Sequence, residues 1–97
     1  HEEPDIRQIG ERRYVVLGRA RLDEFCDTFD VKLERPDVDT VGGLVLAALG
    51  RPARVGDSVE IEGLTFIVTA LDGLAVGRVT CQLPEPGVDE ESGLEED

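Results

Sequence analysis

The chain has 97 residues, enough for one domain. Its apolar share of 40% and charged share of 33% are typical of a globular chain, whereas aromatic residues make up only 4%. The core must therefore be aliphatic. The scarcity of aromatic side chains counts against a surface that stacks nucleic-acid bases or sugar rings.

Negative charge is concentrated at the two ends of the chain. The formal net charge is −12, and residues 1–5 and 85–97 together carry ten acids and no Lys or Arg. Residues 6–84 hold 12 acids and ten bases and are close to neutral. We therefore expect an acidic linker at 1–5, one domain at 6–84 and an acidic, disordered tail at 85–97. Nucleic-acid binding is disfavoured, because phosphate contacts need concentrated positive charge.

The cysteines and the histidine also limit the chemistry. Cys26, Cys81 and His1 are too few for a disulfide scaffold or a recognisable zinc site. Both cysteines lie in apolar stretches, so we expect buried, reduced thiols, which fit a cytoplasmic location. The longest apolar run, residues 44–49, is too short to cross a bilayer, so we expect no direct membrane insertion.

Two strands and a helix are predicted first. Residues 14–17 form a β-type run that ends at Gly18, and Ile6 and Ile9 indicate a preceding edge strand. The period then changes to that of a helix over residues 22–29. Four apolar side chains share one face of this helix: Leu22, Phe25, Cys26 and Phe29.

A second helix follows the polar connection 30–39. Thr40 or Asp39 can cap its start, and Gly50 is typical of a helix stop. Its apolar face comprises Val41, Leu44, Val45, Ala48 and Leu49. Gly42 and Gly43 each cost about 1 kcal/mol relative to Ala inside a helix. We therefore expect another backbone to approach them closely, either a strand of the same domain or a partner.

Period-two patterns predict three further strands. Residues 58–61 lead through Glu62-Gly63 into a strand whose apolar side chains alternate, and Asp72-Gly73 indicates a second hairpin. Ile67 and Leu71 face away from Leu64, Phe66, Val68 and Ala70, so we expect this strand to be central and covered on both sides. The last strand, 74–83, would point one set of side chains to the core: Ala75, Gly77, Val79, Cys81 and Leu83.

The predicted order is β-β-α-α-β-β-β, an α+β domain with a small antiparallel sheet and two helices packed on one face. No catalytic signature accompanies it, because Ser58 and Ser92 lack a nucleophile context and the interior holds no histidine. We therefore expect no enzyme, no metal and no cofactor. A weak cation patch of Asp37, Asp39, Asp57, Glu60 and Glu62 is the alternative to ordinary turn and surface roles.

Three motifs together resemble the CorC/HlyC transporter-associated domain over residues 9–82. The first is Asp39-Thr40-Val41-Gly42-Gly43, continuing to Gly50-Arg51; the others are Gly56-Asp57 before a strand and Asp72-Gly73 before the last hairpin strand. Pro52 directly after Arg51, Val38 before Asp39 and Leu74-Ala75 after Gly73 depart from the family's pattern.

The resemblance implies a C-terminal cytoplasmic module of a magnesium and cobalt efflux protein that contains a pair of CBS domains and often a membrane domain. It implies a fold similar to part of the FAD-binding region of PCMH-type flavoproteins. We expect a non-catalytic regulatory domain that contacts the CBS pair, or a second copy, through residues 40–45 and its edge strands. A module that binds FAD or an adenine nucleotide at the glycine-containing helix start is the alternative.

Overall fold

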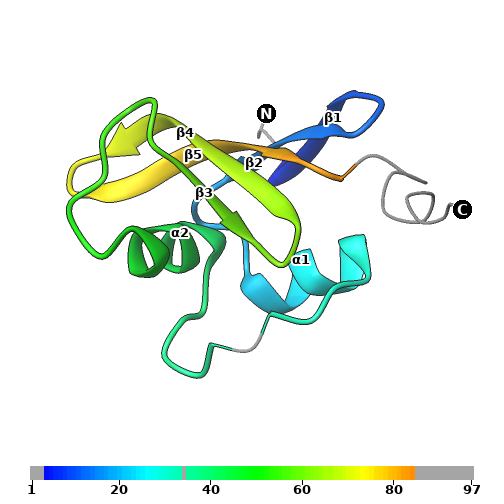
Figure 1. The fold of residues 1–97 in the computed structure, drawn as a ribbon, viewed down its shortest axis with the longest axis horizontal. Helices are drawn as coiled ribbons and strands as arrows, with labels where there is room; N and C mark the ends of the chain where they lie inside the picture. Colours follow the sequence, from blue (N-terminus) through cyan, green and yellow to red (C-terminus); the bar gives the residue numbers. More distant parts are fainter. Residues whose placement is uncertain (1–3, 34, 85–97) are drawn as a thin grey trace, which may run out of the picture.

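A computed structural model of the chain describes residues 4–33 and 35–84. Seven elements follow one another: β1 (Ile6–Gly10), β2 (Arg13–Leu17), α1 (Leu22–Phe29), α2 (Val41–Leu49), β3 (Ser58–Ile61), β4 (Leu64–Asp72) and β5 (Ala75–Gln82). The strands form one antiparallel sheet in the order β1-β2-β5-β4-β3, and both helices lie against the same face of it (Figure 1). The predicted α+β class and element order are confirmed. The further likeness to the FAD-binding region stays a prediction.

The helix α1 has the bounds that its apolar spacing predicts. Leu22 and Phe25 are buried, whereas Cys26 and Phe29 are half-buried at the end of the helix. Asp30 ends the helix with a positive φ of 55°. The side chain at the N-cap position makes no capping bond, and the Leu22 N–H instead donates to the Asp39 carbonyl oxygen at 2.8 Å. The start of α1 is therefore held by the chain that leads into α2.

The helix α2 begins and ends as the sequence predicts. Of the two candidate caps, Thr40 is the one used, since its Oγ1 accepts from the Gly43 N–H at 3.1 Å. Gly50 ends the helix with φ 70°, a conformation that glycine adopts without strain. Val41, Leu44 and Val45 are buried, whereas Ala48 at the far end of the predicted face is exposed.

Both predicted hairpins form. In the β3–β4 hairpin, Ile61 pairs with Leu64, so Glu62 and Gly63 are the loop, with φ values of 53° and 82°. In the β4–β5 hairpin, Asp72 pairs with Ala75. The loop there is Gly73-Leu74, one residue later than the sequence predicts, because Asp72 continues the strand pairing and Gly73 supplies the positive φ of 63°.

The core lies between the sheet and the two helices. The sheet contributes Val16, Ile61, Leu64, Phe66, Val68, Val76, Val79 and Cys81 to it, and the helices and connections contribute Ala20, Leu22, Phe25, Leu33, Val41, Leu44 and Val45. Two of these, Ala20 and Leu33, stand outside any periodic segment, so the sequence pattern did not indicate them. Their burial comes from the path of the connections rather than from a strand or helix period.

Two predictions about the strands are wrong. The pairing of Ala70 with Arg78 and of Leu71 with Val76 skips Gly77, so β5 changes face at this bulge. Val76 is buried in place of Ala75 and Gly77. A second irregularity, which leaves Thr69 between the pairs Val68–Val79 and Ala70–Arg78, turns Ala70 out of the inward set of β4.

The strand β4 is also not covered on both sides. It is internal to the sheet, as predicted, because β5 and β3 flank it. Ile67, however, is only half-buried, and both helices pack on the opposite face. Leu71 pairs with the buried Val76 beyond the bulge, so it lies on the helix side, where it is 40% exposed. An apolar side chain that points away from the core was mistaken for evidence of a second covering layer.

Residues 1–3 and 85–97 of the predicted linker and tail lie outside the described residues. Asp5, which the charge pattern grouped with the linker, is tied to the sheet. Its carbonyl oxygen accepts from the Leu17 N–H at 2.8 Å, and its carboxylate lies 2.9 Å from Arg19 Nε.

Candidate functional site

The predicted site residues fall into three separate places. Asp39 and residues 40–43 lie at the start of α2, residues 50–57 follow its end, and Asp72-Gly73 form part of the β4–β5 hairpin. No single cleft therefore gathers the family motifs, and each place is best understood through its own contacts.

At the start of α2, the chain packs tightly against two other backbones. A Cβ atom added at Gly42 would lie 2.8 Å from the Val76 carbonyl oxygen and 3.0 Å from that of Gly18. The expected close approach is therefore confirmed, and the approaching backbone belongs to this domain. Gly43 differs, because its nearest neighbours are the side chains of Thr40 and Val38. At Gly43, space is kept for the capping hydroxyl rather than for a strand.

The backbone N–H groups at this helix start all have acceptors. Val41 donates to Ala20 at 2.9 Å and Gly42 to Gly18 at 2.9 Å. Gly43 and Leu44 donate to the hydroxyl and the carbonyl of Thr40. A phosphate at this point would have to displace these bonds, so the structure does not favour nucleotide binding here. Because Val41, Gly42, Leu44 and Val45 are buried, the helix start also has little surface to offer a partner.

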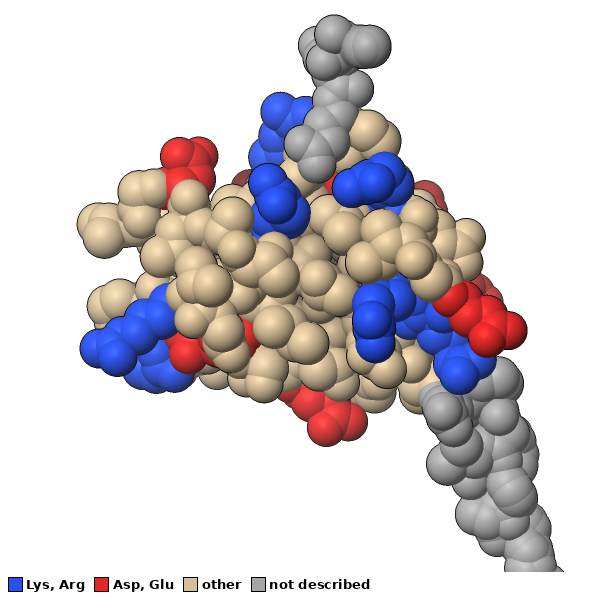
Figure 2. Space-filling model, turned by 90° about the horizontal axis from the view of Figure 1, so that it is seen from above, with Lys and Arg blue, Asp and Glu red and all other residues tan. Residues whose placement is uncertain are grey.

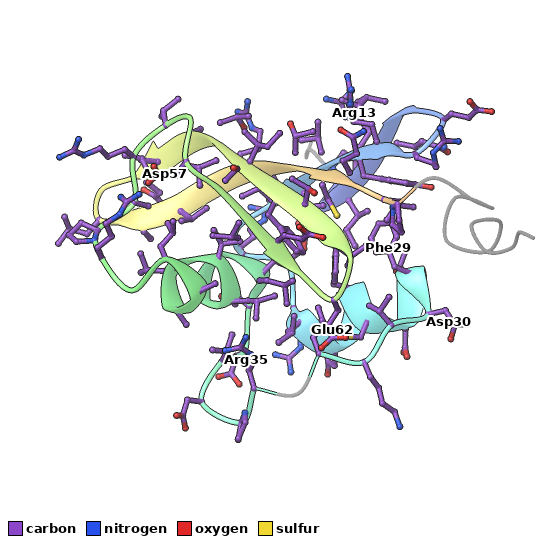
Figure 3. The ribbon with its side chains drawn as sticks, in the orientation of Figure 1. Arg13, Phe29, Asp30, Arg35, Asp57 and Glu62 are labelled. Atoms are coloured by element: carbon purple, nitrogen blue, oxygen red, sulfur yellow. The ribbon has the colours of Figure 1, made fainter. Side chains whose placement is uncertain are left out.

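The segment after α2 is held by one carboxylate. Asp57 accepts from both terminal nitrogens of Arg51 at 3.0 Å and from the Arg54 N–H at 2.8 Å. The Arg51 hydrogen bonds, followed by the Arg54 N–H, hold the pKa of Asp57 below its ordinary value, and Asp57 raises the pKa of Arg51. Figure 3 places Asp57 near the β4–β5 end of the sheet. These residues close a loop, and the guanidinium of Arg51 is engaged by the domain's own Asp57.

A surface hollow of about 770 Å³ lies between α1 and the connection that follows it. Cys26 and Leu33 line it, together with bases such as Lys32 and Arg35 and acids such as Asp27 and Asp39. Figure 3 shows Arg35 on this side, with Glu62 of the β3–β4 turn nearby. Among residues 4–33 and 35–84, no group of three metal-ligating side chains converges in it or elsewhere.

The two cysteines differ in their surroundings. Cys81 is buried on β5, and burial raises the pKa of its thiol to about 12, so the thiol stays protonated at neutral pH. Cys26 is half-buried and lines the hollow. Both are free, and the predicted full burial holds only for Cys81.

The sheet face turned away from the helices is the broad surface of the domain that no described element covers. We call it the outer face and define it by Arg7, Arg13, Val15, Leu17, Ile67, Arg78 and Thr80. Strand register aligns these side chains, since Arg7 pairs with Val15, Val15 with Thr80, Thr80 with Ile67, and Leu17 with Arg78.

The centre and the rim of the outer face differ in character. Val15, Leu17, Ile67 and Thr80 are half-buried, whereas the three arginines are exposed. In Figure 2, which looks onto this face, uncharged side chains form the middle, and both bases and acids stand around it. Figure 3 shows Arg13 projecting away from the helices. The sequence signal for this face was the alternation along the strands, and for Ile67 we interpreted that signal as a second covering layer.

Within the described part of the chain, no helix is long and apolar enough to cross a membrane. The edge strands β1 and β3 that we expected as contact sites are short, and β1 carries an irregularity between Gln8 and Gly10. Such irregularities hinder pairing with a further strand. The outer face is therefore the larger surface available for contact.

Three comparisons relate this fold to known proteins. The family model described as the transporter associated domain, CorC_HlyC, matches residues 7–85. A curated relative from Vibrio cholerae, named magnesium and cobalt efflux protein CorC, is 40% identical over 85 residues, which cover 87% of this chain and 29% of the relative. The chain thus spans less than a third of that relative's length.

Solved structures have the same fold. A haemolysin domain from Enterococcus faecalis is 26% identical with a TM-score of 0.79, and the match covers 84% of this chain and all of that one. A CorC-associated region from Neisseria meningitidis is 24% identical with a TM-score of 0.78, covering 82% of this chain and 99% of that one. The fold therefore occurs in crystals of chains that contain little else.

Proposed function

Because the chain belongs to the CorC_HlyC transporter-associated domain family, we propose that it is a non-catalytic regulatory domain of a magnesium or cobalt efflux protein. The observation that carries the proposal is the 40% identity over 85 residues to a protein named for magnesium and cobalt efflux. The domain would lie on the cytoplasmic side of the membrane beside a pair of CBS domains, as the family resemblance implies.

The proposed mechanism is a difference in docking between two states of the transporter. A domain can shift an equilibrium only if it makes different contacts in each state. In the described part of this domain, the backbones of Gly18, Gly42 and Val76 are in close contact between α2 and the sheet. The outer face, in contrast, is not covered by any described element. The contact between α2 and the sheet keeps the domain's shape. The outer face supplies contacts with the rest of the transporter that can be made in one state and lost in the other.

The test is made in the longer protein that contains this chain. Cells that express it intact, or without residues 6–84, are compared for cobalt sensitivity and for magnesium efflux, with the amount of protein in the membrane measured in each case. We expect altered transport at equal protein level. Unchanged transport together with an unchanged oligomeric state would refute a regulatory role.

Point variants distinguish a docking role from general damage that the deletion causes to the rest of the protein. Leu17→Asp changes a half-buried side chain of the outer face, whereas Ala48→Asp changes an exposed side chain on α2. We expect the outer-face variant to alter transport and the α2 variant to leave it unchanged. Equal behaviour of the two variants would contradict a docking role for the outer face.

A further inference from the structure

Among the described residues, the arginines of the outer face have no ion-pair partner, unlike four other arginines of the domain. Arg19 lies 2.9 Å from Asp5, Arg21 lies 3.4 Å from Asp23 and Arg51 lies 3.0 Å from Asp57. Within residues 4–33 and 35–84, no carboxylate lies within ion-pair distance of Arg7, Arg13 or Arg78. Three positive charges are thus left uncompensated on one face.

The local charge of this face is opposite to that of the whole chain. Register places two acids of the strands there: Glu60, which pairs with Thr65 at the far edge on β3, and the exposed Asp72, which pairs with Ala75 at the end of β4. The three arginines lie on β1, β2 and β5, around Val15 and Ile67. A ligand that fits this surface must be negatively charged and must also carry some apolar side chains for the centre.

The chain itself contains a segment with these properties. Residues 85–97 have the sequence EPGVDEESGLEED, with seven acids, no Lys or Arg, and the apolar Val88 and Leu94. The family match ends at residue 85, so this segment lies beyond the fold that the relatives share.

The last described residues bring the chain to the correct edge of the outer face. Leu83 donates its N–H to the Arg12 carbonyl oxygen at 2.8 Å, and Gln82 pairs with Arg13. The chain therefore leaves β5 beside Arg13. Arg78 lies four residues back along β5, about 13 Å away, and Arg7 lies one strand beyond Arg13. Thirteen residues span at most about 45 Å, enough to reach all three arginines.

We propose that residues 85–97 bind the outer face of their own domain, with their carboxylates on Arg7, Arg13 and Arg78 and their apolar residues over Val15 and Ile67. The contact is held mainly by exposed ion pairs, so it is weak and sensitive to salt, since the screening length falls from about 10 Å at 0.1 M to about 3 Å at 1 M salt. This inference does not rest on the proposed function.

The first experiment compares amide NMR spectra of the 97-residue protein and of a variant in which the seven acids of residues 85–97 are replaced by Gln or Asn. We expect the amides of Val15, Ile67 and Thr80 to differ between the two proteins at 50 mM NaCl. At 1 M NaCl the differences should fall at least about fivefold. No difference on the outer face, or differences centred on the helices, would overturn the proposal.

Arginine variants then locate the binding surface. The peptide 85–97 is added to the charge-neutralised protein, and its dissociation constant is measured for Arg13→Gln/Arg78→Gln and for the matched control Arg35→Gln/Arg54→Gln. We expect the dissociation constant to rise at least about fivefold in the first double variant and to stay unchanged in the control. Equal weakening in both would show non-specific attraction and refute the assigned site.

Dilution distinguishes contact within one molecule from contact between two. The wild-type shift differences should be the same from 20 µM to 1 mM protein. A concentration dependence would assign the segment to a second copy and overturn the intramolecular proposal. The salt dependence of the unmodified protein keeps the idea testable even if an arginine variant fails to fold.

Discussion

The two faces of the sheet are built from the same strands but have opposite roles. On the inner face, Phe66, Val79 and Cys81 are fully buried against the helices. Their neighbours in the chain, Ile67 after Phe66 and Thr80 after Val79, lie on the outer face and are only half-buried. The comparison teaches that alternation places side chains on two sides, whereas the helices decide which side becomes the core.

The largest expected contrast lies between neighbouring residues of β4. Phe66→Ala removes a fully buried ring whose centroid lies 5.7 Å from that of Phe25, so we expect a loss of about 3–5 kcal/mol in the free energy of unfolding. Ile67→Ala should cost about 1 kcal/mol, because its side chain is already partly hydrated. Urea unfolding measures both, and equal losses would mean that a further layer covers the outer face.

The next contrast tests how closely α2 approaches the sheet. The Cβ of Gly42→Ala would meet the Val76 carbonyl oxygen at 2.8 Å, so we expect a loss of about 2–3 kcal/mol. In Gly43→Ala, the Cβ at 3.2 Å from Thr40 Oγ1 costs a small shift, which the roughly 1 kcal/mol helix preference of Ala largely offsets. If the two variants unfold at the same urea concentration, backbone contact is not what requires Gly42.

A smaller effect is expected at the cap of α2. Thr40→Ala leaves the Gly43 N–H without its acceptor, and we expect a loss of about 1 kcal/mol. Thr40→Ser keeps the oxygen and should be close to wild type. Thermal melts of the three proteins check this, and equal destabilisation by Ala and Ser would assign the role to the Thr40 methyl group instead.

The smallest effect concerns the exposed Arg51–Asp57 pair and depends on pH. The pKa of Asp57 is lowered in the folded state, so its contribution to stability is present above the unfolded value of about 3.9 and is lost as the pH falls through the lowered folded pKa. Asp57→Asn should therefore melt below wild type at pH 7, and the gap should narrow below about pH 4. A gap that stays constant down to pH 2 would contradict the assigned ion pair.

Local patterns were enough to predict most of this domain. The spacing of Leu22 and Phe25 set the bounds of α1, and Thr40 and Gly50 marked the ends of α2. Gly63 marked the β3–β4 hairpin because glycine adopts a positive φ without strain, and Glu62 beside it takes a φ of 53°. These features depend on neighbours within a few positions, so a single sequence contains them.

Tertiary structure alone decided the rest. The bulge at Gly77, which brings Val76 rather than Ala75 to the core, depends on pairing between two strands, and the burial of Leu33 depends on the path of a loop. Arg78 is far from Arg7 and Arg13 in sequence, and only the register of β1, β2 and β5 places the three on one face. Sequence determined where each strand and helix forms, because those forces act locally; which faces are covered was settled by packing between distant segments.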